Sequence, residues 1–166
     1  VQQSLKNSDF IILEGKNVQI GLESTIIDCT SPIPTILRQG RITLDDILKI
    51  IATAKELDEV NEKNPAAPGQ LKKHYSPEIK LVMNATYANK NDVFIGFGDI
   101  PIKARAAGLI LNLSPNANLS EAAKNLYSMM HTANQPQKYK TIKVATIPNR
   151  GIGKAINDRL KRAAAN

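Results

Sequence analysis

A proline-rich stretch at residues 65–77, PAAPGQLKKHYSP, constrains the fold of this chain more than any other feature. Its three prolines and one glycine exclude a helix interior and a central strand, because proline lacks a backbone N–H and biases the preceding residue towards extended conformations. We therefore predict a connector between two folded parts. The stretch also sets His74 and Tyr75 beside Lys72 and Lys73, a combination that suits an anionic, planar ligand. A surface linker whose Tyr75 packs on the nearest domain is the alternative.

The composition is that of a folded chain outside the membrane. Hydrophobic residues make up 42% and charged residues 22%, which are near the averages of globular proteins, and no apolar run approaches the roughly 18 residues that a membrane span needs. The single cysteine, Cys29, cannot form an internal disulfide, which favours a reducing, cytoplasmic setting. We expect Cys29 to be a small buried side chain. Because the first methionine is Met83, we expect the chain to begin partway into a longer protein.

Basic residues gather at the C-terminal end. Residues 138–166 contain eight Lys and Arg residues and a single acid, Asp158, so they account for the whole formal net charge of +7. Cations in a last helix complement its dipole and stay solvated, which is the interpretation we favour. A surface that binds tRNA or another polyanion is the alternative.

The first sixty residues predict a unit too small to be stable alone. Strand-forming residues occur at 10–13, 22–29 and 35–38. A helix should follow Thr43, whose hydroxyl can cap it. Its apolar positions repeat at helical spacing at Ile47, Ile50, Ile51 and Ala54. Such a unit would leave strand edges unpaired and bury little apolar surface, so we expect its partners to lie upstream of Val1.

Two polar residues of this first part are candidate site residues. Ser24 lies within strand-like sequence, where a hydroxyl either makes a structural hydrogen bond or contacts a ligand. Arg38 ends a predicted strand just before Gln39 and Gly40. A guanidinium group at such a position can reach a phosphate, while a surface salt bridge is the alternative.

After Pro77 the pattern alternates between strands and helices. Apolar runs predict strands at 79–83, 93–97, 107–113 and 142–147, as in a parallel sheet covered on both faces, with helices at 119–133 and 152–164. The sequence PNRGIG before the last helix could bind an anion, but its third glycine position holds Ile156. We therefore favour a tight turn that docks the last helix on the sheet. The sequence shows no zinc-ligand spacing and no nucleophile with a recognisable base, so we expect neither a metal site nor a catalytic residue.

Three segments in order, GLESTIIDCT, ILRQGRI and APGQLKKHYSP, resemble the two-domain threonylcarbamoyl-AMP synthases, the Sua/YrdC/YciO family. The resemblance implies an α/β protein with three parts. Residues 1–60 would be the C-terminal piece of a YrdC-like catalytic domain, 61–77 the linker, and 78–166 a small Rossmann-like three-layer Sua-type domain.

The resemblance also implies an activity and site residues. The family condenses L-threonine, bicarbonate and ATP into threonylcarbamoyl-AMP and pyrophosphate, for threonylcarbamoyladenosine formation in tRNA. Ser24 matches a position that contacts L-threonine, Arg38 matches one that contacts ATP, and Tyr75 with His74 matches a linker that folds over the nucleotide. ATP is a substrate, accompanied by Mg in the full-length enzyme. A downstream tRNA-modifying transferase is an implied partner, and direct contact with tRNA is left open.

The family's basic K.R element and its S.N element, both upstream in the catalytic domain, have no counterpart in this chain. We therefore predict that the chain alone has no synthase activity and binds no cofactor. We further hypothesise that the linker and the second domain act together as a lid over the nucleotide. A non-catalytic module that binds RNA or a protein partner through its basic C-terminus is the alternative function.

Overall fold

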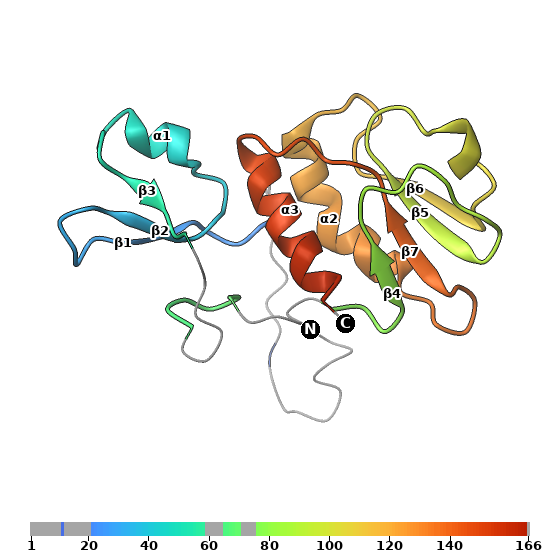
Figure 1. The fold of residues 1–166 in the computed structure, drawn as a ribbon. Coiled ribbons are helices and arrows are strands. Elements are labelled where there is room, and N and C mark those ends of the chain that lie inside the picture. The colour runs from blue at the N-terminus through green and yellow to red at the C-terminus, as the bar shows by residue number, and fades with distance from the viewer. Residues whose placement is uncertain (1–10, 12–20, 59–64, 71–75, 166) are drawn as a thin grey trace.

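A computed structural model describes residues 11, 21–58, 65–70 and 76–165. Their strands form two separate sheets (Figure 1). The smaller sheet consists of β1 (Ile26–Asp28), β2 (Thr35–Arg38) and β3 (Lys55–Glu56), in the order β1-β2-β3. β1 runs antiparallel to β2, and β3 runs parallel to it. The strand predicted at 35–38 is confirmed, whereas the one predicted at 22–29 is reduced to residues 26–28 in its second half, and β3 was not predicted.

The helix predicted after Thr43 is much shorter than its apolar spacing suggested. Helix α1 covers only Leu44–Leu48, and it begins with the expected cap, in which the Thr43 hydroxyl accepts from the Asp46 N–H. None of its residues is buried, and Ile50 beyond it is 86% exposed. The continuation to Ala54 was therefore wrong: no described residue covers Ile50, and after Leu48 the chain turns to pair β3 with β2, with Ala54 buried just before β3.

The larger sheet is entirely parallel. Its strands are β4 (Lys80–Val82), β5 (Asp92–Gly96), β6 (Leu109–Asn112) and β7 (Thr141–Val144), in the order β4-β7-β5-β6. All four predicted strands are confirmed. Every residue of the inner strand β5 is buried, as expected for a strand covered on both faces.

The two faces of this sheet are covered differently. Helices α2 (Leu119–Ala133) and α3 (Ile152–Ala163) lie together on one face (Figure 1), and their apolar residues join the strands in the main core. The other face carries a small cluster around Phe94 and Ala104, the latter in the short 3-10 helix η1 (Ile102–Ala104). The Rossmann-like α/β fold and its layers are thus as predicted.

The glycine loop before α3 is a turn, as we favoured. Gly151 has a φ of 51°, a conformation suited to glycine. A Cβ at Gly153 would lie 2.1 Å from the carbonyl oxygen of Pro148, so only glycine fits there. Ile156 and Leu160 of α3 are buried in the core.

Two further expectations are tested by the structure. Cys29 is exposed, so its predicted burial was wrong: it follows the last residue of β1, and none of the described apolar clusters includes it. Over the residues that the structure describes, no helix is long and apolar enough to cross a membrane.

Candidate functional site

The structure brings Ser24 and Arg38 into direct contact. The Arg38 guanidinium donates from Nε to the Ser24 carbonyl oxygen at 3.0 Å and from Nη2 to the Ser24 hydroxyl at 3.2 Å. Its Nη1 donates to the Pro68 carbonyl oxygen at 3.2 Å. A guanidinium has five N–H donors, and two of those of Arg38 have no partner among the described residues. The two residues predicted from the resemblance therefore form one polar unit at the end of β2.

Gly40 allows this close approach. A Cβ there would lie 2.3 Å from the backbone nitrogen of Thr25 and 2.6 Å from the carbonyl oxygen of Glu23. The end of β2 thus packs directly against the backbone of residues 23–25. The Thr25 hydroxyl completes the contact by donating to the Ile42 carbonyl oxygen at 2.7 Å, so that hydroxyl has a structural role.

A cavity of about 320 Å³ opens beside this unit. Its walls are the backbone and side chains of residues 22–25 together with Arg41 and Ile42. The exposed lining of this cavity is mostly apolar, although Ser24 and Arg41 are among the residues that form it.

The first part of the linker is fixed to β2. Gln70 is buried, and its side-chain amide donates to the Leu37 carbonyl oxygen at 2.8 Å while its Oε1 accepts from the Ala67 N–H at 3.0 Å. The linker thus passes directly beside Arg38. His74 and Tyr75 lie outside the described residues, so their predicted role over the nucleotide stays a prediction.

A cluster of charged and polar residues joins the segment at residues 23–25 to the second domain, which contains the parallel sheet with α2 and α3. Arg159 of α3 is 1% exposed, and it donates from Nε and Nη2 to Oε2 of Glu23, both at 3.0 Å. The Tyr127 hydroxyl on α2 lies 2.9 Å from both carboxylate oxygens of Glu23. Asp158 accepts from Nη1 of Arg159 at 2.9 Å. One carboxylate next to Ser24 is thus bound by both helices of the second domain.

The surroundings of this cluster shift its proton affinities. Burial raises the pKa of Glu23, but a backbone hydrogen bond, the charge of Arg159 and the hydrogen bonds from Tyr127 and Arg159 outweigh it and hold that pKa below its ordinary value of 4.5. Burial and the neighbouring Glu23 carboxylate raise the pKa of the Tyr127 phenol. Glu23 is therefore an anion and Tyr127 a neutral donor at neutral pH.

Three of the four cations of α3 bind groups inside the molecule, whereas Lys161 is exposed. Lys154 forms a 2.6 Å ion pair with Glu56 of β3, and Arg162 donates to the Gln70 carbonyl oxygen and to Asp158. The expectation that the basic end is solvated is therefore wrong for Arg159, which is buried. Sequence analysis missed this set of contacts because Glu23 and Arg159 lie 136 positions apart, and only the concentration of charge at the C-terminus hinted at it.

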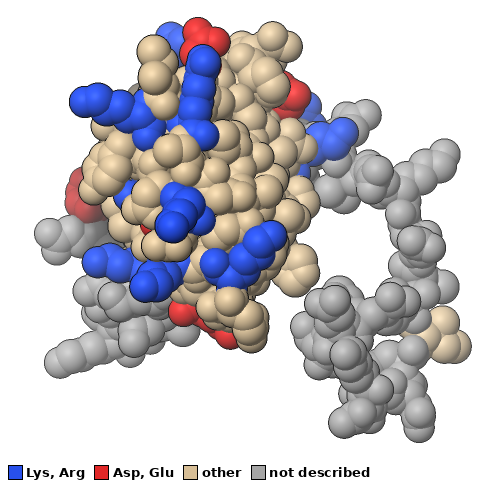
Figure 2. All heavy atoms as spheres, turned by 90° about the vertical axis from the view of Figure 1, so that its right-hand side faces the viewer, with Lys and Arg blue, Asp and Glu red and all other residues tan. Residues whose placement is uncertain are grey.

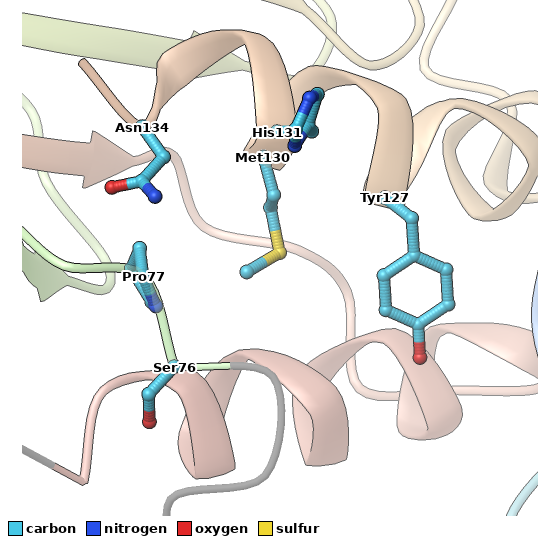
Figure 3. A pocket seen from close by; sticks show the side chains of 6 residues that line it. All are labelled: Ser76, Pro77, Tyr127, Met130, His131 and Asn134. Atoms are coloured by element: carbon cyan, nitrogen blue, oxygen red, sulfur yellow. The ribbon is translucent and has the colours of Figure 1, made fainter. Parts of the chain in front are cut away.

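A second cavity, of about 260 Å³, lies where the linker enters the second domain. Figure 3 shows Met130 and Tyr127 extending from α2 towards α3, with Ser76 and Pro77 opposite. The cavity neighbours the Tyr127–Glu23 contact. Among the described residues, no group of three or more His, Cys, Asp or Glu side chains could hold a metal ion.

Comparison with known proteins identifies related sequences. Residues 42–165 match the family "Threonylcarbamoyl-AMP synthase, C-terminal domain". The chain is 29% identical to the Bacillus subtilis threonylcarbamoyl-AMP synthase over 168 aligned positions, which cover 92% of this chain and 48% of that protein. It is 25% identical to the Pyrococcus abyssi protein of the same name, again covering 92% and 48%. The chain thus spans about half the length of the curated relatives it matches.

Solved structures support the same fold. The crystal structure of P. abyssi Sua5 complexed with L-threonine superposes with a TM-score of 0.71 at 21% identity, over 88% of this chain and 46% of that one. A variant of P. abyssi Sua5 in which a consecutive histidine and tyrosine are replaced by alanine gives a TM-score of 0.68 at 22% identity, over the same shares. From the fold and the family match together, this chain belongs to the threonylcarbamoyl-AMP synthase C-terminal domain family.

Proposed function

We propose that this chain contributes one wall of the L-threonine and ATP site of a threonylcarbamoyl-AMP synthase, together with the C-terminal domain that supports this wall. The observation that carries the proposal is the contact between Ser24 and Arg38 beside the cavity at residues 22–25. These residues are 14 positions apart, and the family resemblance assigns Ser24 to L-threonine and Arg38 to ATP. The structure of P. abyssi Sua5 with L-threonine adds support, because that relative binds the amino acid.

Each side chain has a chemical role in the proposed reaction. The Ser24 hydroxyl hydrogen-bonds the carboxylate or amine of L-threonine, and Arg38 uses its remaining N–H donors for phosphate oxygens of ATP. Arg41 lines the same cavity and adds positive charge. The threonine amine and bicarbonate condense to a carbamate with loss of one water molecule. A carboxylate oxygen of this carbamate then attacks the α-phosphorus of ATP, and the bond to pyrophosphate breaks, so that pyrophosphate leaves with the electron pair. Mg enters with the nucleotide as part of the substrate.

The linker is proposed to cover the nucleotide with His74 and Tyr75. Support comes from its first part, because Pro68 and Gln70 bond to Arg38 and to β2. The variant of the P. abyssi protein shows that a consecutive histidine and tyrosine also occur in that relative. In this proposal the linker and the C-terminal domain close together over bound ATP.

The chain by itself is proposed to lack synthase activity, because it spans about half of its relatives. To test this, pyrophosphate release is measured with L-threonine, bicarbonate and ATP for the 166-residue chain and for a fusion that places the upstream half of the B. subtilis relative before Val1. We expect release from the fusion only, and its loss in Ser24→Ala and Arg38→Ala fusions. Release from the chain alone would contradict the proposed inactivity, and a folded fusion without release would contradict the proposed function.

The alternative of an RNA- or partner-binding module gains no support from α3, whose Lys154, Arg159 and Arg162 have partners inside the molecule. Figure 2 shows the side of the second domain opposite the smaller sheet, where Lys and Arg are spread among neutral residues. The transferase partner, contact with tRNA and the cytoplasmic location stay predictions.

A further inference from the structure

The segment that carries Ser24 is held between two parts of the molecule. On one side, Gly40 and Arg38 contact its backbone at residues 23–25. On the other side lie the helices of the C-terminal domain. Relying on the proposed function, we infer that Arg159 is a positioning residue for L-threonine binding: through the Glu23 carboxylate, it fixes the place of Ser24 in the site.

The backbone just before Ser24 docks on the C-terminal domain at consecutive positions. A Cβ at Gly21 would lie 2.5 Å from the Lys124 carbonyl oxygen of α2, so the chain runs directly along this helix. Leu22 packs against the main core of the C-terminal domain. Glu23 then binds Arg159 and Tyr127. Residues 21–23 thus contact the second domain one after another, although they belong to the first part of the chain.

The Glu23 carboxylate is held from two helices, so its position is fixed in more than one direction. Arg159 donates two hydrogen bonds to Oε2, and the Tyr127 hydroxyl meets both oxygens from another helix. A guanidinium holds its N–H groups in a rigid plane, so two bonds from it fix both distance and orientation. Because Ser24 is the next residue, a fixed Glu23 leaves the Ser24 backbone little freedom to move.

The contact between Arg159 and Glu23 carries a desolvation cost, because both side chains are largely removed from water. The Arg159 side chain is 1% exposed and that of Glu23 is 26% exposed. Taking a guanidinium out of water is unfavourable unless its donors are satisfied. Here Nε and Nη2 bind Glu23, and Nη1 binds Asp158. An apolar side chain at position 159 would fill the same space without this desolvation cost. The buried guanidinium therefore serves to fix Glu23, the residue next to the proposed substrate contact Ser24.

The same helix offers a matched control. Lys154 of α3 also forms an ion pair with the first part of the chain, but its partner is Glu56 of β3. Lys154→Met therefore removes an interdomain ion pair from α3 without touching the segment at Ser24. Arg159→Lys tests geometry, because it keeps the positive charge and removes the planar pair of donors.

The first experiment measures steady-state kinetics of the fusion described above. We expect Arg159→Met to raise the KM for L-threonine about tenfold or more, the size typical of lost hydrogen bonds to a charged group, with the KM for ATP changed much less. Arg159→Lys should recover part of the loss, and Lys154→Met should leave both constants at their original values. In a Glu23→Gln background, Arg159→Met should add little, because the two residues act as one unit.

The second experiment uses the 166-residue chain itself and needs no activity. Amide hydrogen exchange in Arg159→Met should accelerate at residues 22–28, whereas in Lys154→Met it should accelerate around residues 55–58. An unchanged KM for L-threonine in an active Arg159→Met fusion would overturn the inference while leaving the proposed function intact. If no fusion is active, the proposed function fails, and exchange at residues 22–28 that is equal in both variants would overturn the placement of the segment by Arg159.

Discussion

The two sheets of this molecule are stabilised in different ways. The parallel sheet β4-β7-β5-β6 has a continuous apolar core shared with α2 and α3. In the β1-β2-β3 sheet, β1 and β3 contain no fully buried residue, and β2 contributes only Thr35 and Ile36. This smaller sheet and the segment before it are instead held by polar contacts, from Glu23 and Glu56 to α3 and from Leu37 to Gln70 of the linker.

The comparison teaches that the smaller sheet depends on the larger domain for its position. An apolar core is insensitive to pH and to single charges, whereas ion pairs between two regions respond to both. The region that carries the candidate site is therefore the one whose geometry should respond to single substitutions of charged residues on α3. The predictions below test this difference, from the largest expected effect to the smallest.

Removal of core volume from the larger domain should have the largest effect. Leu126 of α2 is fully buried, and we expect Leu126→Ala to lower the free energy of unfolding by about 3–5 kcal/mol because it leaves a cavity in a packed core. Ile36→Ala in β2 should cost less, about 2 kcal/mol, the lower end of the range for such changes, since the sparser surroundings can relax. Denaturant unfolding measures both. An equal loss in the two variants would contradict the difference between the sheets.

A side chain at Gly40 should damage the site without unfolding the larger domain. In Gly40→Ala the new Cβ would meet backbone atoms of residues 23–25 at 2.3–2.7 Å, and such overpacking costs about 1–3 kcal/mol. We expect faster amide exchange at residues 23–28 and a normal rate in β5. Gln39→Ala adds no atom near that backbone and serves as the control. Unchanged exchange in Gly40→Ala would show that the close approach is not required.

Acid should loosen the contact between the regions before it affects the core. The pKa of Glu23 is lower in the folded chain than its ordinary 4.5, so its stabilising contribution is complete above pH 4.5 and is lost as the pH falls through the lower folded value. Exchange at residues 22–28 should therefore accelerate below pH 4.5, after correction for the intrinsic rate. In Glu23→Gln this additional pH dependence should disappear. Its persistence there would assign the effect to another group.

The Lys154–Glu56 ion pair should contribute the least. Both side chains are about one-third exposed, at 35% and 34%, and ion pairs screened by water contribute about 0–1 kcal/mol. Lys154→Met should therefore change the free energy of unfolding by less than about 1 kcal/mol in denaturant titrations. A loss as large as that in Leu126→Ala would mean that polar contacts stabilise the whole chain, which the comparison of the two sheets excludes.

The sequence predicted the larger domain well because its signals are local. Strand β5 carries a continuous apolar run, and helices α2 and α3 carry apolar residues at helical spacing. Helix α2 also begins with an Asn118 cap, and all three elements formed where expected. The stripe from Ile47 to Ala54 carried the same kind of signal, but the helix stopped at Leu48 because nothing in the described residues covers Ile50. Strand β3 has only two residues and no local signal.

The candidate site was predicted only in part. Ser24 and Arg38 came from the family resemblance, and their contact is visible only in three dimensions. Glu23 and Arg159 could not be paired from one sequence, because ion pairs between distant segments leave no periodic pattern. Burial of Arg159 was unexpected for the same reason. Arginine is almost never fully buried unless it is paired, and the sequence does not reveal that Glu23 is its partner.

The buried amide of Gln70 ties the start of the proline-rich linker to both regions of the molecule. Its side chain accepts from the Ala67 N–H and donates to the Leu37 carbonyl oxygen, while its own carbonyl oxygen accepts from Arg162 of α3. Inserting residues between Ala67 and Gln70 would break the first of these bonds and release the linker from the strand that ends at Arg38.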